Sequence, residues 1–346
     1  MSRKVHSSKT DRITIADVAR EAQVSPATVS FVLNRTPGQT ISLGTRMRVI
    51  EASRALGYLP NPNARALGKG YSDEIANISF EPVKSYGMLE WLTFTQQRTQ
   101  QLGYTPGTYL YYGSSPDAMI ETYLGILARR PAGIMTTRLL MTKEIYKLTK
   151  RMGVRACVIL SPTPVDYVPT LILPYQEGGQ LAGLHFVERG HKCVAFIEPI
   201  SPTPLRLEVS QVFLRGMQSV LSQSDVTVIR FPMDPTLESA RETVGKILGC
   251  KPKPTAVFGF TDDYCLRLHK AIQECGLRMP DDLALVGSED TELSSLVHPT
   301  LTALRFDIQA LAFQWVDRVD ALIREQKFSP ELLTPPPSRL IIRESS

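Results

Sequence analysis

A short stretch, VSPATVSFVLN at residues 24–34, places hydroxyl, amide and small side chains in front of a small apolar patch. Ser, Thr and Asn side chains hydrogen-bond to phosphate oxygens, whereas small or apolar side chains can lie against base edges. We expect base-edge contacts from Pro26, Ala27 and Phe31, and phosphate contacts from Thr28, Ser30 and Asn34. The chemistry that this stretch predicts is recognition of a nucleic acid.

Sequence signals for catalysis are absent. The chain contains no GxxxxGK, HExxH or GxSxG, and its five histidines include no i, i+4 pair suited to a metal. Its five cysteines are scattered and form no CxxC pair, which argues against a disulfide framework or a zinc site. We therefore expect no metal and no cofactor, and no enzyme unless distant residues assemble a catalytic triad.

The positive charge is confined to the N-terminal part of the chain. Residues 1–70 hold eleven Lys or Arg against four Asp or Glu, net +7, whereas residues 71–346 hold 28 against 30, net −2. Such a basic unit is expected of a module that meets phosphates. The polar N-terminus and the lack of an eighteen-residue apolar run predict a cytoplasmic protein with no membrane partner.

Three short helices are predicted to position the residues of 24–34. Thr14 and Asp17 have the spacing of a capping box, and Ser25 can cap a second helix that begins at Pro26. Ser42 can cap a third helix, which Gly57 ends. The residues available for packing are Val18, Ala19, Ala22, Val29, Val32, Leu33, Met47, Val49, Ile50 and Leu56.

This arrangement is a helix-turn-helix braced by a third helix. The second helix can be short because only its N-terminal turns must enter a major groove. A three-helix domain with no role in DNA binding is the alternative. Farther on, Asn61 and Pro62 can start a helix of some seven residues, which is too short to be stable alone in water and therefore needs a partner.

Residues 13–70 resemble the DNA-binding headpiece of the lactose/galactose repressor family, through TIADVAREAQVSPATVSFVLN, TRMRVIEASRALGYLPN and ARALGKG. The resemblance implies that residues 61–69 form a hinge helix, which folds when two protomers meet on DNA, and that Leu67 wedges into the minor groove. Packing is the alternative role for Leu67. Phe31 departs from the arginine or other polar residue that family members often have. The predicted DNA contacts are Thr14, Ser25, Pro26, Ala27, Thr28, Ser30, Phe31, Asn34, Asn63, Ala64 and Leu67.

From residue 74 onward, apolar runs such as IANISF, AGIMTT, ACVILS, VAFIE and LALVGS alternate with helix-like stretches. This alternation predicts an α/β fold with parallel strands, in sufficient number for two sheets. Segments such as GGQLAGLHFVERGHKCVAFI, TAVFGFTDDYCLRLHKAI and RLIIRES resemble the periplasmic-binding-protein-like core of the same family. The resemblance implies two lobes with a ligand cleft between them.

The resulting organisation has four parts. We expect a flexible basic arm over residues 1–12, an all-α helix-turn-helix domain over 13–60, a hinge over 61–70 and a two-lobed core for effector binding and dimerisation over 71–346.

Residues carried over by position suggest which ligand the cleft takes. Asp262 keeps the family's carboxylate and Glu289 stands where an aspartate is common, whereas Phe213 replaces a frequent arginine. The complete set of expected effector contacts is Tyr86, Met88, Ser161, Pro174, Phe213, Asp262 and Glu289. This set contains few of the carboxylate and guanidinium groups that bind a polyol through paired hydrogen bonds. A more apolar or aromatic-bearing ligand is therefore expected, with a sugar-like effector or no effector as alternatives.

The leading interpretation is a DNA-binding transcriptional regulator that acts as a repressor, with a palindromic operator and a small-molecule effector as partners. The chain has no appended leucine heptads, so a two-fold homodimer is the simplest assembly. The alternative is a solute-binding protein that uses the same core for ligand capture. The basic N-terminal unit favours the regulator.

Overall fold

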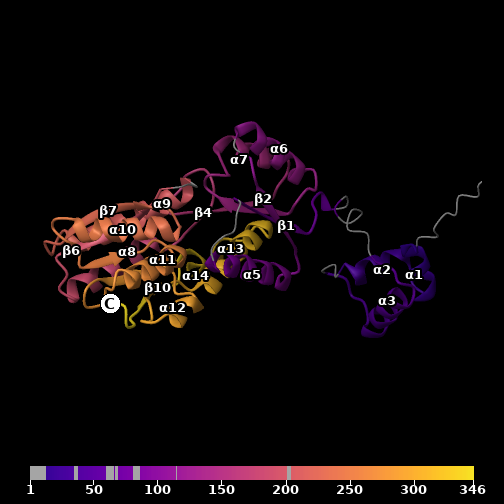
Figure 1. Cartoon of the computed structure of the whole chain (residues 1–346). Coiled ribbons are helices and arrows are strands. Elements are labelled where there is room, and N and C mark those ends of the chain that lie inside the picture. Colours follow the sequence, from indigo (N-terminus) through magenta and orange to yellow (C-terminus); the bar gives the residue numbers. More distant parts are fainter. Residues whose placement is uncertain are drawn as a thin grey trace, which may run out of the picture. The chain divides into compact units, whose positions relative to one another are not determined.

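The computed structural model describes residues 13–34, 38–59, 66, 69–80, 86–113, 115–200 and 204–346. The chain divides into two compact units, Met1–Ser72 and Asp73–Ser346 (Figure 1). We call the first unit the headpiece and the second unit the core.

The headpiece contains the three predicted helices, α1 (Ile15–Glu21), α2 (Pro26–Leu33) and α3 (Leu43–Ala55). Both serine caps are present, because Ser25 Oγ accepts from the Thr28 N–H at 3.1 Å and Ser42 Oγ accepts from the Thr45 N–H at 3.2 Å. The helices enclose a small core of valine and alanine side chains, comprising Val18, Ala19, Ala22, Val29, Val32, Val49 and Ala52.

One packing prediction for the headpiece is wrong. Met47 was expected to pack inside, but it is 48% exposed. The buried face of α3 is formed by Val49, Ala52 and Ser53, and Met47 precedes Val49 by two residues. Two residues correspond to about 200° around a helix, which places Met47 on the solvent side.

The core alternates strands and helices as predicted. Its strands are β1 (Glu74–Phe80), β2 (Thr105–Tyr111), β3 (Gly133–Thr137), β4 (Ala156–Ser161), β5 (Thr170–Ile172), β6 (Cys193–Pro199), β7 (Thr227–Met233), β8 (Ala256–Phe258), β9 (Ala284–Gly287), β10 (Thr302–Arg305) and β11 (Arg339–Ile341). Its helices are α5 (Tyr86–Gln101), α6 (Pro116–Leu127), α7 (Lys143–Arg151), α8 (Tyr175–Glu188), α9 (Pro204–Leu221), α10 (Leu237–Gly249), α11 (Asp262–Glu274), α12 (Glu292–Leu296), α13 (Ile308–Ile323) and α14 (Pro330–Leu333).

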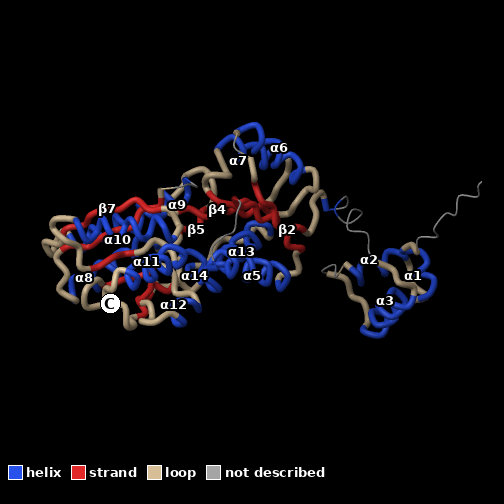
Figure 2. Tube along the Cα trace, viewed as in Figure 1, coloured by secondary structure: helices blue, strands red, loops and turns tan. Residues whose placement is uncertain are grey.

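The strands form two sheets, which define two lobes (Figure 2). The sheet of the first lobe has the order β2-β1-β3-β4-β5, and all its neighbouring strands are parallel. The sheet of the second lobe has the order β11-β10-β9-β8-β6-β7, in which only the pairing of β11 with β10 is antiparallel. The predicted two-lobed α/β fold is confirmed. The strand pattern did not single out β5 or β10, which are only three and four residues long.

The chain crosses between the lobes three times, at residues 173–174, at 306–307 and between Leu333 and Arg339. After the second crossing, α13 lies beside α5 in the first lobe (Figure 1). Arg98 of α5 pairs with Asp317 of α13 at 2.7 Å, and the rings of Trp91 and Trp315 lie 5.6 Å apart. The first lobe is therefore completed by a segment from near the end of the chain.

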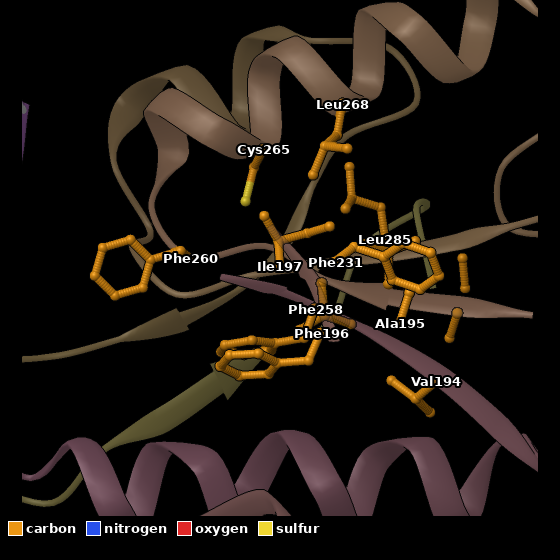
Figure 3. Packing of buried hydrophobic residues seen from close by; sticks show 14 of the residues in the cluster. Val194, Ala195, Phe196, Ile197, Phe231, Phe258, Phe260, Cys265, Leu268 and Leu285 are labelled. Atoms are coloured by element: carbon orange, nitrogen blue, oxygen red, sulfur yellow. The ribbon is translucent and has the colours of Figure 1, made fainter. Parts of the chain in front are cut away.

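Helices cover both faces of the second sheet. Figure 3 shows Cys265 and Leu268 of α11 pointing toward one face, with Phe196 and Phe258 on the other face. Those two phenylalanines are register partners on β6 and β8, and their rings stack with centroids 5.6 Å apart. A sheet buried on both faces needs nearly continuous apolar strands, as VAFI in β6 illustrates. Among the described residues, no helix has the length and apolarity needed to span a bilayer.

Candidate functional site

The first candidate site is the beginning of α2. Ser25, Pro26 and Ala27 are exposed there, while Val29 and Val32 on the same helix are buried in the headpiece core. The Ser25 cap and the proline at the first helical position fix where the helix begins, and the two valines fix which face turns inward. The helix therefore presents its first turn to solvent.

The polar side chains of α2 interact with near neighbours. The Ser25 and Thr28 hydroxyl oxygens lie 2.9 Å apart, and the Asn34 side-chain amide donates to Ser30 Oγ at 3.0 Å. Thr28, Ser30, Phe31 and Asn34 are all half-buried. The Thr28, Ser30 and Asn34 side chains are therefore held by hydrogen bonds to near neighbours along the chain.

Thr14 has a structural role in the headpiece. The Asp17 carboxylate accepts from the Thr14 N–H at 2.9 Å and from the Thr14 hydroxyl at 2.6 Å. These hydrogen bonds from Thr14 lower the pKa of Asp17. The other predicted DNA contacts, Asn63, Ala64 and Leu67, lie outside the described residues, as do the basic arm 1–12 and most of the segment 61–70.

The second candidate site is a cavity of about 610 Å³ between the two lobes of the core. This volume is within the range of small-molecule sites. The cavity is lined by five of the seven expected effector contacts, namely Met88, Ser161, Pro174, Phe213 and Glu289. Tyr86 begins α5, but its side chain lies outside the described residues.

Asp262 is not part of the cavity lining. It is buried at the start of α11, where its Oδ2 accepts from the Thr291 N–H at 3.2 Å, from Ser294 Oγ at 3.0 Å and from the Thr291 hydroxyl. Burial raises the pKa of Asp262, although these hydrogen bonds oppose the shift. In this structure Asp262 holds the loop after β9, which carries Glu289.

Glu289 is the most perturbed carboxylate of the cavity wall. Burial and then the negative charge of Asp262 raise the pKa of Glu289 to about 7, while the backbone of Asp262 and the charge of Arg206 lower it. A Cβ added at Gly87 would lie 3.5 Å from Glu289 Oε1. Glu289 belongs to the second lobe and Gly87 to the first, so the carboxylate reaches across the cavity.

Six aromatic residues in the described part of the chain line the cavity, and only Phe213 was predicted from the sequence. Tyr175, Phe213 and Phe306 form a cluster with ring centroids 5.0 to 6.1 Å apart. The complete aromatic lining is Trp91, Phe94, Tyr175, Phe213, Phe260 and Phe306. Phe260 and Phe306 come within two residues of the carboxyl ends of β8 and β10. Ligands bind at the carboxyl ends of strands in α/β sheets, so this position was the signal that could have identified both.

Three polar side chains face the cavity without a hydrogen-bond partner among the described residues. They are Trp91, through its indole N–H, and Thr137, through its hydroxyl, both more than nine-tenths buried, and they are joined by the hydroxyl of half-buried Thr261. No cluster of three or more His, Cys, Asp or Glu side chains suited to a metal ion occurs in the described part of the chain. The cavity thus offers aromatic surface, a few hydrogen-bonding groups and one perturbed carboxylate.

Two family models match the chain. The model described as bacterial regulatory proteins, lacI family, matches residues 14–61, and the model described as a periplasmic binding protein-like domain matches residues 184–346.

Curated relatives extend over nearly the whole length. Catabolite control protein A of Priestia megaterium is 29% identical over 310 residues, which cover 87% of this chain and 91% of that protein. The HTH-type transcriptional repressor PurR of Mannheimia succiniciproducens is 28% identical, covering 92% of this chain and 97% of that protein. The lactose operon repressor of Escherichia coli is 26% identical, covering 93% and 88% respectively.

A solved structure shares the architecture of both units. The lac repressor dimer bound to operator and the anti-inducer ONPF aligns with a TM-score of 0.79 and 26% identity, covering 97% of this chain and 99% of that one. Sequence models, full-length relatives and structure therefore agree that the chain joins a lacI-family DNA-binding region to a periplasmic-binding-protein-like core, as the similar repressors do.

Proposed function

We propose that the protein is a transcriptional repressor that binds a palindromic DNA operator as a homodimer and responds to a small molecule held between the lobes of its core. The main supporting observation is that one chain contains two features. Its headpiece has a helix α2 whose first turn is exposed, and its core has a cavity of about 610 Å³ between the lobes. A solute-binding protein needs only the second of these features. The likeness to the lac repressor dimer on its operator supports the complete assignment.

Base recognition is assigned to the beginning of α2. Pro26 and Ala27 are exposed and suit apolar contacts with base edges, to which half-buried Phe31 adds its accessible edge. Thr14, Ser25, Thr28, Ser30 and Asn34 are assigned to phosphates. Asn63, Ala64 and Leu67 are assigned to the hinge over residues 61–70, with Leu67 as the minor-groove wedge.

Regulation follows from the two lobes. A ligand that binds between them favours one angle between the lobes over another, and this choice changes how the hinges of two protomers pair. Such coupling is reciprocal, so operator DNA must change the affinity for the effector by the same factor. We assign the effector contacts to Met88, Ser161, Pro174, Phe213 and Glu289, with Tyr86 at the mouth and Asp262 acting through the Glu289 loop.

The same proposal places the protein in the bacterial cytoplasm, associated with the nucleoid, and gives it no catalytic role. The two relatives named as repressors support this assignment, and the described residues of the two candidate sites include no nucleophile hydrogen-bonded to a neighbouring histidine or lysine.

Selection of genomic fragments by the purified protein tests the function. A recovered consensus should be palindromic, and fluorescence anisotropy should show that affinity for it falls steeply with salt, because phosphate contacts release counterions. Replacing exposed Ala27 with Gln should change the preferred bases, whereas replacing exposed Met47 with Gln on α3 should leave the consensus unchanged. Failure to retain any duplex at low ionic strength would refute the proposal.

A further inference from the structure

Three charged side chains of the cavity lining are already engaged, namely those of Asp290, Arg305 and Asp307. Asp290 pairs with Arg305 and, at 2.7 Å, with Arg343, and Asp307 accepts from the Ala310 N–H at 2.9 Å as the cap of α13. Glu289 differs from Asp290 and Asp307, because its carboxylate forms no ion pair within the described residues and does not cap a helix. A carboxylate in such a wall is costly to ionise unless a cation joins it.

Besides its charged groups, the described lining offers a polyol three unpartnered polar groups, the Trp91 indole N–H and the Thr137 and Thr261 hydroxyls, which are fewer than the hydroxyls of a sugar. Each sugar hydroxyl that loses water must find a partner, and an unpaired buried polar group costs about 1–3 kcal/mol. Hydroxyl groups of the wall are partly committed, since the Thr291 hydroxyl donates to Asp262, the Ser288 hydroxyl donates to the Phe260 carbonyl and Ser161 Oγ accepts from the Thr163 N–H at 3.2 Å. The six aromatic side chains instead offer a large apolar surface for a flat body.

We propose that the effector is a cationic amine with a flat, largely apolar body, whose ammonium group pairs with Glu289 while the body lies among the aromatic side chains. This assignment rests on the proposed function, because it names the chemical class of the ligand in the same cavity. Tyr175 and Phe213, whose ring centroids lie 5.0 Å apart, provide π faces and edges in the same wall, and a cation gains further attraction from aromatic faces.

The other charges near Glu289 are compatible with this ligand. Arg206 is a nearby cation whose positive charge lowers the pKa of Glu289. This effect is smaller than the increase caused by burial and by Asp262, so the negative charge of Glu289 is only partly balanced. The titratable groups that interact with it are Asp262, Asp263, Arg206 and Tyr175, and the other charged residues of the cavity lining are Glu90, Asp290, Arg305, Asp307 and Arg339. Acidic groups are in the majority.

The position of Glu289 also connects the ligand to the lobe angle. Its carboxylate approaches Gly87 at the start of α5, so the group that binds the ammonium ion touches both lobes. Neutralising Glu289 by an ammonium ion removes the main cost of holding this carboxylate between the lobes. The amine therefore favours the arrangement of the lobes that is described here.

Matched probe pairs test the inference on the full-length protein. Isothermal titration calorimetry compares phenethylamine with phenethyl alcohol and tryptamine with tryptophol, since each pair shares its ring and differs in the cation. At least one amine should bind roughly tenfold or more tightly than its alcohol, as expected for a charge-assisted contact with little solvent. The advantage should shrink from about pH 8 to about pH 6, because protonation of Glu289 removes the anion.

Two variants decide whether Glu289 is responsible. Glu289→Gln should abolish the preference for the amine and keep binding of the ring, whereas Glu292→Gln, which alters an exposed carboxylate of α12 outside the cavity lining, should leave the preference unchanged. The inference is overturned if neither amine binds better than its alcohol, or if the preference survives Glu289→Gln. Anisotropy on the selected DNA fragments is measured in the same samples. Intact DNA binding without amine preference refutes only the ligand class, while absence of specific DNA binding refutes the proposed function.

Discussion

The headpiece and the core build their functional surfaces in different ways. In the headpiece, polar side chains bond to partners three or four residues away, as in Ser25 with Thr28 and Ser30 with Asn34. In the core, the cavity wall is assembled from distant segments, and Asp262 accepts from Thr291, twenty-nine positions along the chain. The recognition helix is therefore encoded locally, whereas the ligand cavity exists only when both lobes are folded.

The two units also differ in how their interiors are filled. Among the described residues, the buried apolar side chains of the headpiece core are all valine or alanine, whereas the second lobe buries Phe186, Phe196, Phe213 and Phe258 together with many aliphatic side chains. A small domain buries a smaller fraction of its surface and has less stability in reserve. Helix caps should therefore contribute a larger share of the free energy of unfolding in the headpiece, and close packing a larger share in the core.

The close approach of α8 and α9 gives the largest expected effect. A Cβ at Gly179 of α8 would overlap the backbone carbonyl of Phe213 on α9, and backbone cannot move aside as a side chain can. Gly179→Ala should therefore lower the free energy of unfolding of the core by about 3 kcal/mol, as expected for overpacking. Urea unfolding followed by circular dichroism measures the change.

Gly245→Ala is the matched control for that variant. Gly245 lies on the exposed face of α10, and an added Cβ there has no atom within 4 Å. This change should stabilise the core by roughly 0.5–1 kcal/mol, because alanine loses less conformational entropy in a helix than glycine. Equal effects at the two glycines would contradict the assigned packing of α8 against α9.

The pH dependence of the core gives the second effect. The folded pKa of Glu289 is raised to about 7 from 4.5, so between these values the folded state holds a proton that the unfolded state releases. The free energy of unfolding should therefore fall as the pH rises through this window. For a side chain that is partly open to solvent, the loss amounts to about 1–2 kcal/mol. Chemical unfolding at a series of pH values measures it.

Glu289→Gln should flatten that dependence and make the core more stable than the parent above pH 7. Some slope should remain, because Asp262 also has a raised pKa and contributes with the same sign. Glu292→Gln should retain the full slope. A parent protein whose stability rises across this window would show that Glu289 is not buried as described.

The same contrast explains what could be predicted from the sequence. The caps Ser25 and Ser42, the buried Val29 and the alternation of strands and helices depend on local spacing, and the structure bears them out. Resemblance located Phe213 and Glu289 in the cavity wall. Tyr175 was missed because it reaches the wall only through a crossing between the lobes, which no local pattern reveals.

The smallest expected effect concerns helix N-caps, which occur in both units. Ser42 Oγ caps α3 and Thr236 Oγ1 caps α10, where it accepts from the Ser239 N–H at 3.1 Å. Ser42→Ala and Thr236→Ala should each cost about 1 kcal/mol. The headpiece is expected to be the less stable unit, so its backbone amides should exchange hydrogen clearly faster after Ser42→Ala. Thr236→Ala should leave the protection of the β6 and β8 amides in the core nearly unchanged. Unchanged hydrogen exchange in the headpiece after Ser42→Ala would show that packing, as in the core, dominates its stability. That result would contradict the contrast between the two units.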